Sequence, residues 1–235
     1  MAISSSSRGL RPGVCTSTTR PSNPYDGMVI YETDTDKVAI YDVNAWVYKT
    51  GTTAPALFTV IPASVSVGSG TGSVGASGSV TFSSASSVSL NNCFTTTYDN
   101  YRIMLDYIPT QSNGLVSRYR NNGIDESSAS YGNAVFFYRS NNTSGGEAAN
   151  TGLTYSYLIN QSANGYTALS IDVINPKKAS YSLMHLLGTI GVSSTDVKSF
   201  FGIAQLANTN TYDGITFYPL SGTITGTLRV YGYNQ

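Results

Sequence analysis

The chain has 235 residues, of which 11% are charged, and its 13 basic and 13 acidic residues give a formal net charge of zero. This length suits one large domain or two unequal ones. Proteins that bind nucleic acid or an anionic membrane usually carry a clustered basic face. Here the one basic pair, Lys177-Lys178, follows Pro176 and fits a solvated turn. The charge balance therefore indicates neither nucleic acid nor a membrane as a partner.

The composition predicts an all-β protein. The chain contains 18 Tyr and 23 Gly together with abundant Ser, Thr, Asn and Val, which is typical of short strands joined by many turns. No stretch has the apolar spacing of an amphipathic helix. The nearest candidate, "SYSLMHLLGTIG" at 180–191, ends in glycines and is interpreted as a buried strand.

Residues 1–24 are rich in Ser, Thr, Arg and Pro and have few apolar residues. Such a segment cannot bury enough surface to offset its ordering entropy, so we interpret it as an attachment arm. It lacks an apolar core of signal-peptide length, and no run of about 18 apolar residues occurs in the chain. We therefore expect a soluble protein that is made in the cytoplasm.

Residues 25–51 predict a small β-meander. Its strands are "MVIYET", "VAIYD" and "WVYK", and the turns "DTDK" and "VNA" separate them. A meander of this size is marginally stable alone, and its aromatic side chains need cover. Other copies of the chain could provide that cover, and the alternative is packing against the chain's own larger domain. The candidate interface residues are Tyr31, Tyr41, Trp46 and Tyr48.

Residues 52–78 predict a linker or stalk because Gly and Ser dominate their second half. The segment "GSGTGSVG" superficially matches a dinucleotide-binding glycine pattern. That pattern requires a following helix and an acidic residue about 20 positions on, and the sequence supplies neither. A nucleotide cofactor is therefore not expected.

Residues 79–235 contain a series of short strands separated by Asn, Gly, Ser and Asp turns. The stretches "YRIMLDYI" and "TLRVYGY" alternate clearly between two faces. Evenly spaced strands of this kind predict an antiparallel β-sandwich with a jelly-roll-like arrangement. A module of this size can bury a core of its own.

The sequence favours a protein without catalytic or metal-binding residues. His185 is the only histidine and lies among apolar residues, which is more typical of a core or interface position than of a base. Asp34 and Asp36 lack the glycine and distal glutamate of a calcium loop and fit a turn. Cys15 and Cys93 have no metal-ligand spacing. A disulfide between them is open in principle, but free thiols are more common in cytosolic products.

Carboxylate pairs for polysaccharide cleavage are weakly supported. Asp125 and Glu126 are neighbours, so on a strand they would point to opposite faces. Asp106 and Asp172 lie in predicted strands, where they could be buried partners or surface residues. Loops rich in Tyr, Asn, Ser and Gly suit adaptable recognition, although all-β proteins also use these residues for turns.

The segment "TRPSNPYDGMVIYETDTDKVAIYDVNAWVYKTG" resembles one found near the N-terminus of tail-fibre-like, minor tail and head-fibre proteins of tailed bacteriophages. The stretches "YDNYRIML" and "GITFYPLSGTITGTLRVYGYNQ" are similar to the final β-domain of the same group. The resemblance implies a virion protein that forms homotrimers, attaches to other virion proteins through its N-terminal region and presents an outward C-terminal domain. It identifies no residue for contact with a receptor.

The sequence thus predicts a non-enzymatic, trimeric tail appendage without cofactors, whose outward domain contacts the host surface through a glycan or a protein. The alternative is a head fibre or capsid decoration protein anchored by its N-terminal arm. A polysaccharide-degrading spike is the third hypothesis. The sequence does not distinguish a tail location from a head location.

Overall fold

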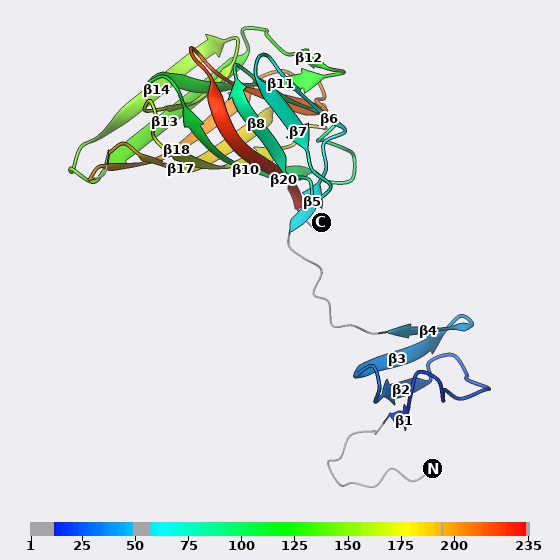
Figure 1. The fold of residues 1–235 in the computed structure, drawn as a ribbon. Coiled ribbons are helices and arrows are strands. Elements are labelled where there is room, and N and C mark those ends of the chain that lie inside the picture. Colours follow the sequence, from blue (N-terminus) through cyan, green and yellow to red (C-terminus); the bar gives the residue numbers. More distant parts are fainter. Residues whose placement is uncertain (1–11, 49–56, 194, 234–235) are drawn as a thin grey trace. The chain divides into compact units, whose positions relative to one another are not determined.

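The computed structural model describes residues 12–48, 57–193 and 195–233, and these ranges contain strands but no helix (Figure 1). The chain divides into an N-terminal unit, Met1–Pro55, and a larger unit, Ala56–Gln235. The predicted all-β class is confirmed. Part of the predicted arm, residues 1–11, and residues 49–56 around the predicted start of the linker lie outside the described ranges.

The N-terminal unit is a four-stranded mixed sheet in the order β1-β2-β3-β4. Strands β2, β3 and β4 are antiparallel neighbours in chain order and match the three strands expected from the sequence. The strand bounds are β1 (Gly13–Cys15), β2 (Val29–Glu32), β3 (Lys37–Asp42) and β4 (Ala45–Tyr48).

Strand β1 lies within the predicted arm and pairs in parallel with β2. The arm is therefore not uniformly without structure, and residues 12–24 belong to the N-terminal unit. A strand of three residues is too short for an alternating pattern to be recognised. Its partner β2 follows only after a long connection, so the sequence alone does not show that the two strands pair. For these two reasons β1 could not be predicted from the sequence.

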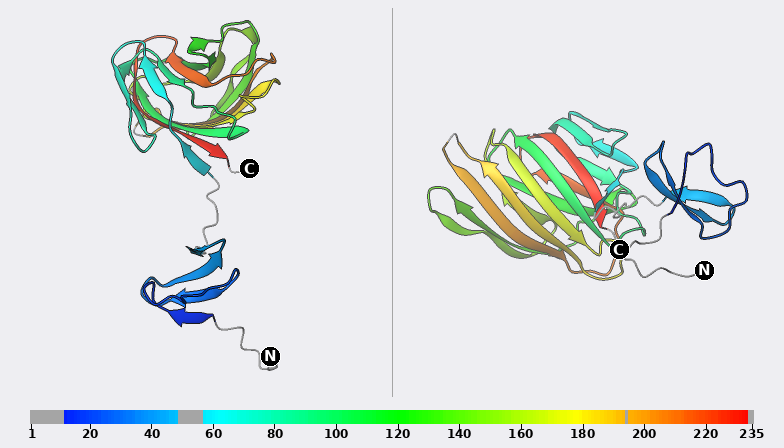
Figure 2. Two further views of the ribbon diagram at one scale, coloured as in Figure 1. Left: turned by 90° about the vertical axis from the view of Figure 1, so that its right-hand side faces the viewer. Right: turned by 90° about the horizontal axis from the view of Figure 1, so that it is seen from below.

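The larger unit contains two antiparallel sheets, and the ten-stranded one curls into a half-barrel (Figure 2). Its path is β14-β13-β18-β17-β16-β10-β20-β8-β7, and β5 also pairs with β20. The strand bounds are β5 (Leu57–Val60), β7 (Thr71–Val74), β8 (Val80–Ala85), β10 (Asn100–Pro109), β13 (Tyr131–Arg139), β14 (Ser144–Leu153), β16 (Thr167–Ile174), β17 (Ser182–Gly191), β18 (Val197–Leu206) and β20 (Ile224–Tyr233).

The second sheet has six strands in the order β12-β11-β19-β9-β6, and β15 pairs with β11. The strand bounds are β6 (Ser64–Val67), β9 (Val88–Asn91), β11 (Gly114–Asn121), β12 (Ile124–Asp125), β15 (Ser156–Asn160) and β19 (Gly214–Pro219). One continuous core lies between the two sheets, since it joins Leu105 and Ile171 of the ten-stranded sheet to Tyr119 and Phe217 of the six-stranded sheet.

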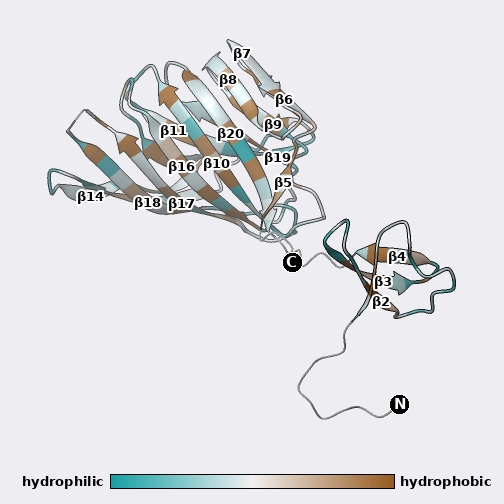
Figure 3. Ribbon diagram, turned by 60° about the horizontal axis from the view of Figure 1, so that its bottom comes forward, coloured by the Kyte–Doolittle hydropathy of each residue, from teal (hydrophilic) through white to brown (hydrophobic). Residues whose placement is uncertain are grey.

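Strand alternation decides which residues enter this core. Apolar and polar bands alternate along the long strands of the ten-stranded sheet (Figure 3). The strand predicted at 180–191 is confirmed as β17, but it is not buried on both faces as expected. Met184 and Leu186 are buried, whereas the intervening Leu183, His185 and Leu187 are exposed.

The predicted linker is wrong over its described part, because strands β5, β6 and β7 lie within residues 57–74 and pair with the larger unit. Val65, Val67 and Val74 pack against the core. The glycines there allow close approach between strands. Gly70 has φ of +71°, and a Cβ atom at this position would collide with the carbonyl oxygen of Ser83. The Gly/Ser composition thus reflects tight packing rather than a spacer.

The β3–β4 turn provides a test of backbone strain. Its central residues, Val43 and Asn44, have φ of 39° and 69°, a left-handed conformation that β-branched residues adopt at a cost. We predict that Val43→Asn stabilises the N-terminal unit by about 1 kcal/mol. Thermal unfolding followed by the fluorescence of the single tryptophan, Trp46, measures this. Val14→Asn, at an exposed strand position, should give no gain, and an unchanged or lower midpoint for Val43→Asn would contradict the prediction.

Candidate interaction surfaces

A buried carboxylate organises one face of the N-terminal sheet. Glu32 is fully buried, and its oxygens accept hydrogen bonds from Arg20 Nε at 2.5 Å, Thr35 Oγ1 at 2.9 Å and Tyr48 Oη at 2.9 Å. Arg20 Nη2 also donates to Tyr48 Oη at 2.7 Å. Arg20 comes from the β1–β2 connection and Tyr48 from the last strand. The Glu32 carboxylate therefore links the β1–β2 connection to β4, the edge strand on the other side of the sheet.

The electrostatics of this network favour the charged form of Glu32. The hydrogen bond from Arg20 is the main cause that lowers the pKa of Glu32, with further contributions from Tyr48 and Thr35, against the opposing effect of burial. The same bond raises the pKa of Arg20. The Arg20 guanidinium and the Lys37 ammonium lie 5.6 Å and 4.9 Å from the centre of the Tyr48 ring. Cations and an aromatic ring thus surround the carboxylate.

The opposite face of the same sheet is apolar and open. Backbone register places alternate residues of all four strands on it. Its valines are exposed by 67% at Val14, 40% at Val29, 37% at Val38 and 41% at Val47. We call this surface the apolar face, and its residues are Val14, Val29, Tyr31, Val38, Ile40 and Val47. The only charged strand residue on this face is Asp42, which lies at the end of β3 opposite Ala45, so most of the face is hydrocarbon.

The four aromatic residues predicted at a trimer interface do not gather on one surface. Tyr41 and Trp46 make an edge-to-face contact with ring centres 5.2 Å apart, and both lie on the Glu32 side, as does Tyr48. Tyr31 lies on the apolar face, where its hydroxyl donates to Asp36. The sequence drew attention to the aromatic residues and away from the valines, although alternation already grouped Val29 with Tyr31 and Val38 with Ile40.

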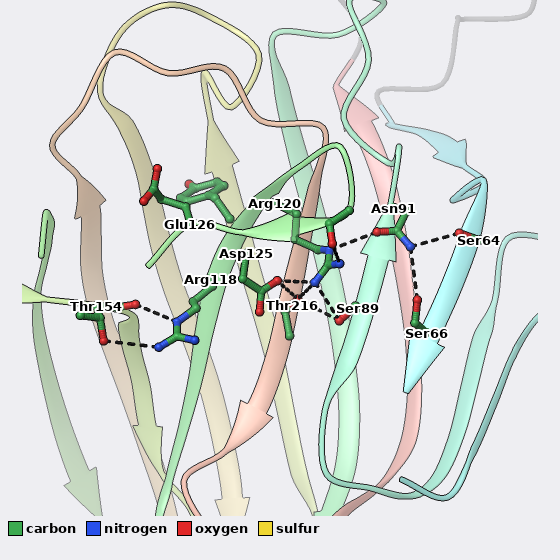
Figure 4. Close-up of polar contacts among 12 residues, drawn as sticks. Ser64, Ser66, Ser89, Asn91, Arg118, Arg120, Asp125, Glu126, Thr154 and Thr216 are labelled. Atoms are coloured by element: carbon green, nitrogen blue, oxygen red, sulfur yellow. Dashed lines mark hydrogen bonds and ion pairs between the residues drawn. The ribbon is translucent and has the colours of Figure 1, made fainter. Parts of the chain in front are cut away.

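The six-stranded sheet carries a polar network on its outer face (Figure 4). Arg120 Nε donates to Asn91 Oδ1 at 3.0 Å, and Arg120 Nη1 donates to Thr216 Oγ1 at 2.7 Å and Ser89 Oγ at 3.1 Å. The same guanidinium forms an ion pair with Asp125. These partners lie on three other strands, β9, β19 and β12. The network therefore cross-links neighbouring strands of the sheet, and the Arg120 guanidinium is paired within the sheet.

The carboxylates considered for catalysis are already engaged in local contacts. Asp125 points toward Arg120, and Glu126 points away from it (Figure 4). Glu126 accepts hydrogen bonds from the Ser128 amide at 2.8 Å and Tyr212 Oη at 3.1 Å. Burial acts to raise the pKa of Glu126, but these hydrogen bonds outweigh it and the pKa is lowered. The two neighbours thus serve separate networks.

The other two carboxylates lie on the outer face of the ten-stranded sheet. Asp172 accepts two hydrogen bonds from the guanidinium of Arg102, at 2.7 Å and 2.8 Å. Burial would raise the pKa of Asp172, but the bonds from Arg102 and Tyr233 outweigh it and lower the pKa. Asp106 lies on the neighbouring strand, opposite Ala168. Asp172 is therefore held in a surface ion pair with Arg102.

The remaining candidate residues also make local contacts or lie apart. Asp34 accepts hydrogen bonds from the amide of Ser17 at 2.8 Å and from its hydroxyl at 2.5 Å. Cys15 and Cys93 are free and lie in different units, and burial raises the pKa of the Cys93 thiol. Within residues 12–48, 57–193 and 195–233, no group of three or more His, Cys, Asp or Glu side chains could hold a metal ion. The same ranges include no helix of the length and apolarity needed to cross a membrane.

Comparisons with protein-family models, with curated proteins and with solved structures give no match to this chain. The functional interpretation therefore depends on the surfaces described above and on the resemblance seen in the sequence.

The pKa of Glu32 gives a prediction with a definite sign. Because the pKa is lowered in the folded unit, charged Glu32 stabilises the fold above its unfolded value of about 4.3, and this stability is lost as the pH falls through the folded pKa. We predict that the thermal midpoint of the N-terminal unit falls below about pH 4.3. Glu32→Gln should lower the midpoint at neutral pH and flatten its dependence on acid.

Trp46 fluorescence reports this transition, because Trp46 is the only tryptophan and lies in the N-terminal unit. Glu126→Gln in the larger unit serves as the control and should leave the Trp46 profile unchanged. A Glu32→Gln protein with the parent's pH profile would show that the carboxylate does not carry the stability assigned to it.

Proposed function

We propose that this chain is a non-enzymatic structural protein of a tailed-phage virion appendage, and that its copies associate as a homotrimer through the apolar face of the N-terminal sheet. The observation that carries this proposal is that face itself. Four valines that are each more than a third exposed share one face of a small sheet whose other face carries the Glu32 network. Association would remove this surface from water.

The energetics favour copies of the same chain as the cover. Full burial of an exposed valine side chain contributes about 1.5 kcal/mol or more, and these valines still have between 37% and 67% of their surface exposed. A closed cyclic assembly repeats each such contact in every copy. A sheet of four short strands has little other surface with which to gain stability. Three copies with their apolar faces turned toward a common axis would form the core that one copy lacks.

The assignment to a virion is supported by the resemblance of residues 19–51 and of the C-terminal stretches to tail-fibre-like, minor tail and head-fibre proteins. In this proposal the N-terminal region attaches to other virion proteins and the larger unit faces outward to contact the host surface. The finer description of the larger unit as a jelly-roll-like β-sandwich belongs to the same proposal. Its support is the single core that the two antiparallel sheets share.

Substitution on the apolar face tests the assembly. We predict that Val38→Lys and Val47→Lys each raise the dissociation constant of the N-terminal contact at least tenfold, because each places an unpaired ammonium group in the apolar contact between copies. Val43→Lys is the matched control, since Val43 is 76% exposed in the β3–β4 turn. Sedimentation equilibrium of the full chain at several concentrations measures the effect. Equal association of all three variants and the parent would contradict the proposal.

Imaging of virions tests the location. We predict that antibodies against the larger unit decorate the tail of intact particles, as seen by electron microscopy, and that antibody preabsorbed with the purified protein does not. Decoration of the capsid would favour the head-fibre alternative. Virions that contain none of this protein would overturn both assignments.

A further inference from the structure

The outer face of the ten-stranded sheet carries an apolar strip that the proposed function does not use. On β17 and β18 alternate residues are buried, so the intervening residues point away from the core. Apolar bands cross these neighbouring strands in Figure 3. We call this surface the outer strip, and its residues are Met104, Phe136, Tyr138, Leu183, Leu187, Val197, Phe201 and Ile203, all more than a third exposed.

Strand register assembles the strip into a ridge. Phe136 lies opposite Phe201, and Phe201 lies opposite Leu187 on the next strand. The two phenylalanine rings stack with centres 5.7 Å apart. The row continues through Ser170 to Met104. Large apolar side chains therefore stand in line across several strands, perpendicular to the strand direction.

A hollow lies beside this ridge on the same strands. Its lining includes Gly132 and Ala134 on β13, which have little or no side chain, together with Leu183, Ile203 and Gln205. The volume is about 260 Å³. Gly132 and Ala134 precede Phe136 by four and two residues, so they share its face of the sheet. The ridge and the hollow thus lie next to each other along the strands.

The charge on this face selects the kind of partner. Apart from His185, the outward positions of β13, β17 and β18 that form the strip and its hollow carry no acidic or basic side chain. Charged side chains of the neighbouring strands lie beside it. Arg229 is opposite Met104, and Asp106 follows Met104 by two positions on the same face of β10. Asp172 is opposite His185 and forms an ion pair with Arg102. Interface cores are depleted in charge and enriched in aromatic residues and Met. A neutral apolar partner fits this surface, and a second copy of the strip is such a partner.

The area of the strip is also sufficient for a specific contact. Each large side chain, at exposures between 36% and 62%, presents up to about 100 Å². Eight of them together approach the roughly 800 Å² that each partner contributes to a stable interface. Patches of this size on single proteins commonly mark an interaction site.

We infer that the outer strip binds the outer strip of a second copy of this chain, with the ridge of each copy in the hollow of the other. The two copies are related by a two-fold axis that lies between their outer faces, perpendicular to the strands. This rotation reverses the strand direction, so the ridge of each copy meets the hollow of the other. Each strand then faces the same strand of the partner copy. The row through Ala134, Ile203 and His185 then lies at the axis. This contact goes beyond the proposed function, because it joins larger units and would connect appendages that the N-terminal face assembles.

The full chain tests this inference by sedimentation equilibrium. We expect Leu187→Lys and Phe201→Lys each to weaken the strip contact at least tenfold, and Ala134→Trp to do so without adding charge, because it fills the hollow. Ile124→Lys is the control, since Ile124 is 74% exposed on β12 of the other sheet. Circular dichroism should show that all variants remain folded. Association identical to the parent in the strip variants, or a parent that never associates through the larger unit, would overturn the inference.

Two further arms separate this contact from the N-terminal one. In a Val38→Lys background the strip should still support association. Loss of the strip contact alone therefore leaves the proposed function standing, and loss of the N-terminal contact alone leaves this inference standing. In a Cys15→Ser background, His185→Cys should cross-link two copies with a short bismaleimide, because position 185 lies at the axis. Ile124→Cys should not. Equal cross-linking at both positions would contradict the ridge-in-hollow arrangement.

Discussion

A β-sheet has two faces, and a chain that covers one of them with its own residues leaves the other to solvent or to a partner. The larger unit meets this constraint by packing two antiparallel sheets on one core, which leaves the outer face of each sheet open. The N-terminal unit has only a single small sheet, so no second sheet of this unit covers either of its faces. The character of the open faces therefore decides what each unit can do.

The open faces differ in polarity. The outer face of the six-stranded sheet holds Arg120 with its partners in a closed polar network, and such a face can remain in water without cost. The outer strip and the apolar face hold hydrocarbon instead. Water disfavours surfaces of that kind in proportion to their area, so the structure gains stability when they are covered.

The Glu32 network shows how the N-terminal unit can persist with an open apolar face. A fully buried carboxylate is costly unless it is paired and hydrogen-bonded, and here Arg20, Thr35 and Tyr48 supply those bonds. They come from the connection before β2, the turn after it and the last strand. The network fixes the sheet from one side, so the other side can serve association.

Much of this organisation could be read from the sequence, for physical reasons that also explain the exceptions. A short apolar stretch that ends in glycines predicted the strand at 180–191, and alternation predicted β2, β3 and β4 of the N-terminal sheet. It could also have identified Glu32, which lies in phase with buried Ile30 in "VIYE", but not Arg20, which only the fold brings to it. The Gly and Ser residues of 52–78 predicted a linker or stalk because composition does not distinguish close strand approach from flexibility. Continuous apolar sequence in β17 suggested burial on both faces, which hid the outer strip.

The most direct test of the central claim, that copies of the chain cover these open apolar faces, is hydroxyl-radical footprinting of the full chain at high and low concentration. The account predicts that Tyr31 on the apolar face and Phe201 on the outer strip become protected from oxidation as concentration rises. Ile124 should react equally at both concentrations. Equal oxidation of Tyr31 and Phe201 across a concentration range in which the chain demonstrably associates would contradict the account.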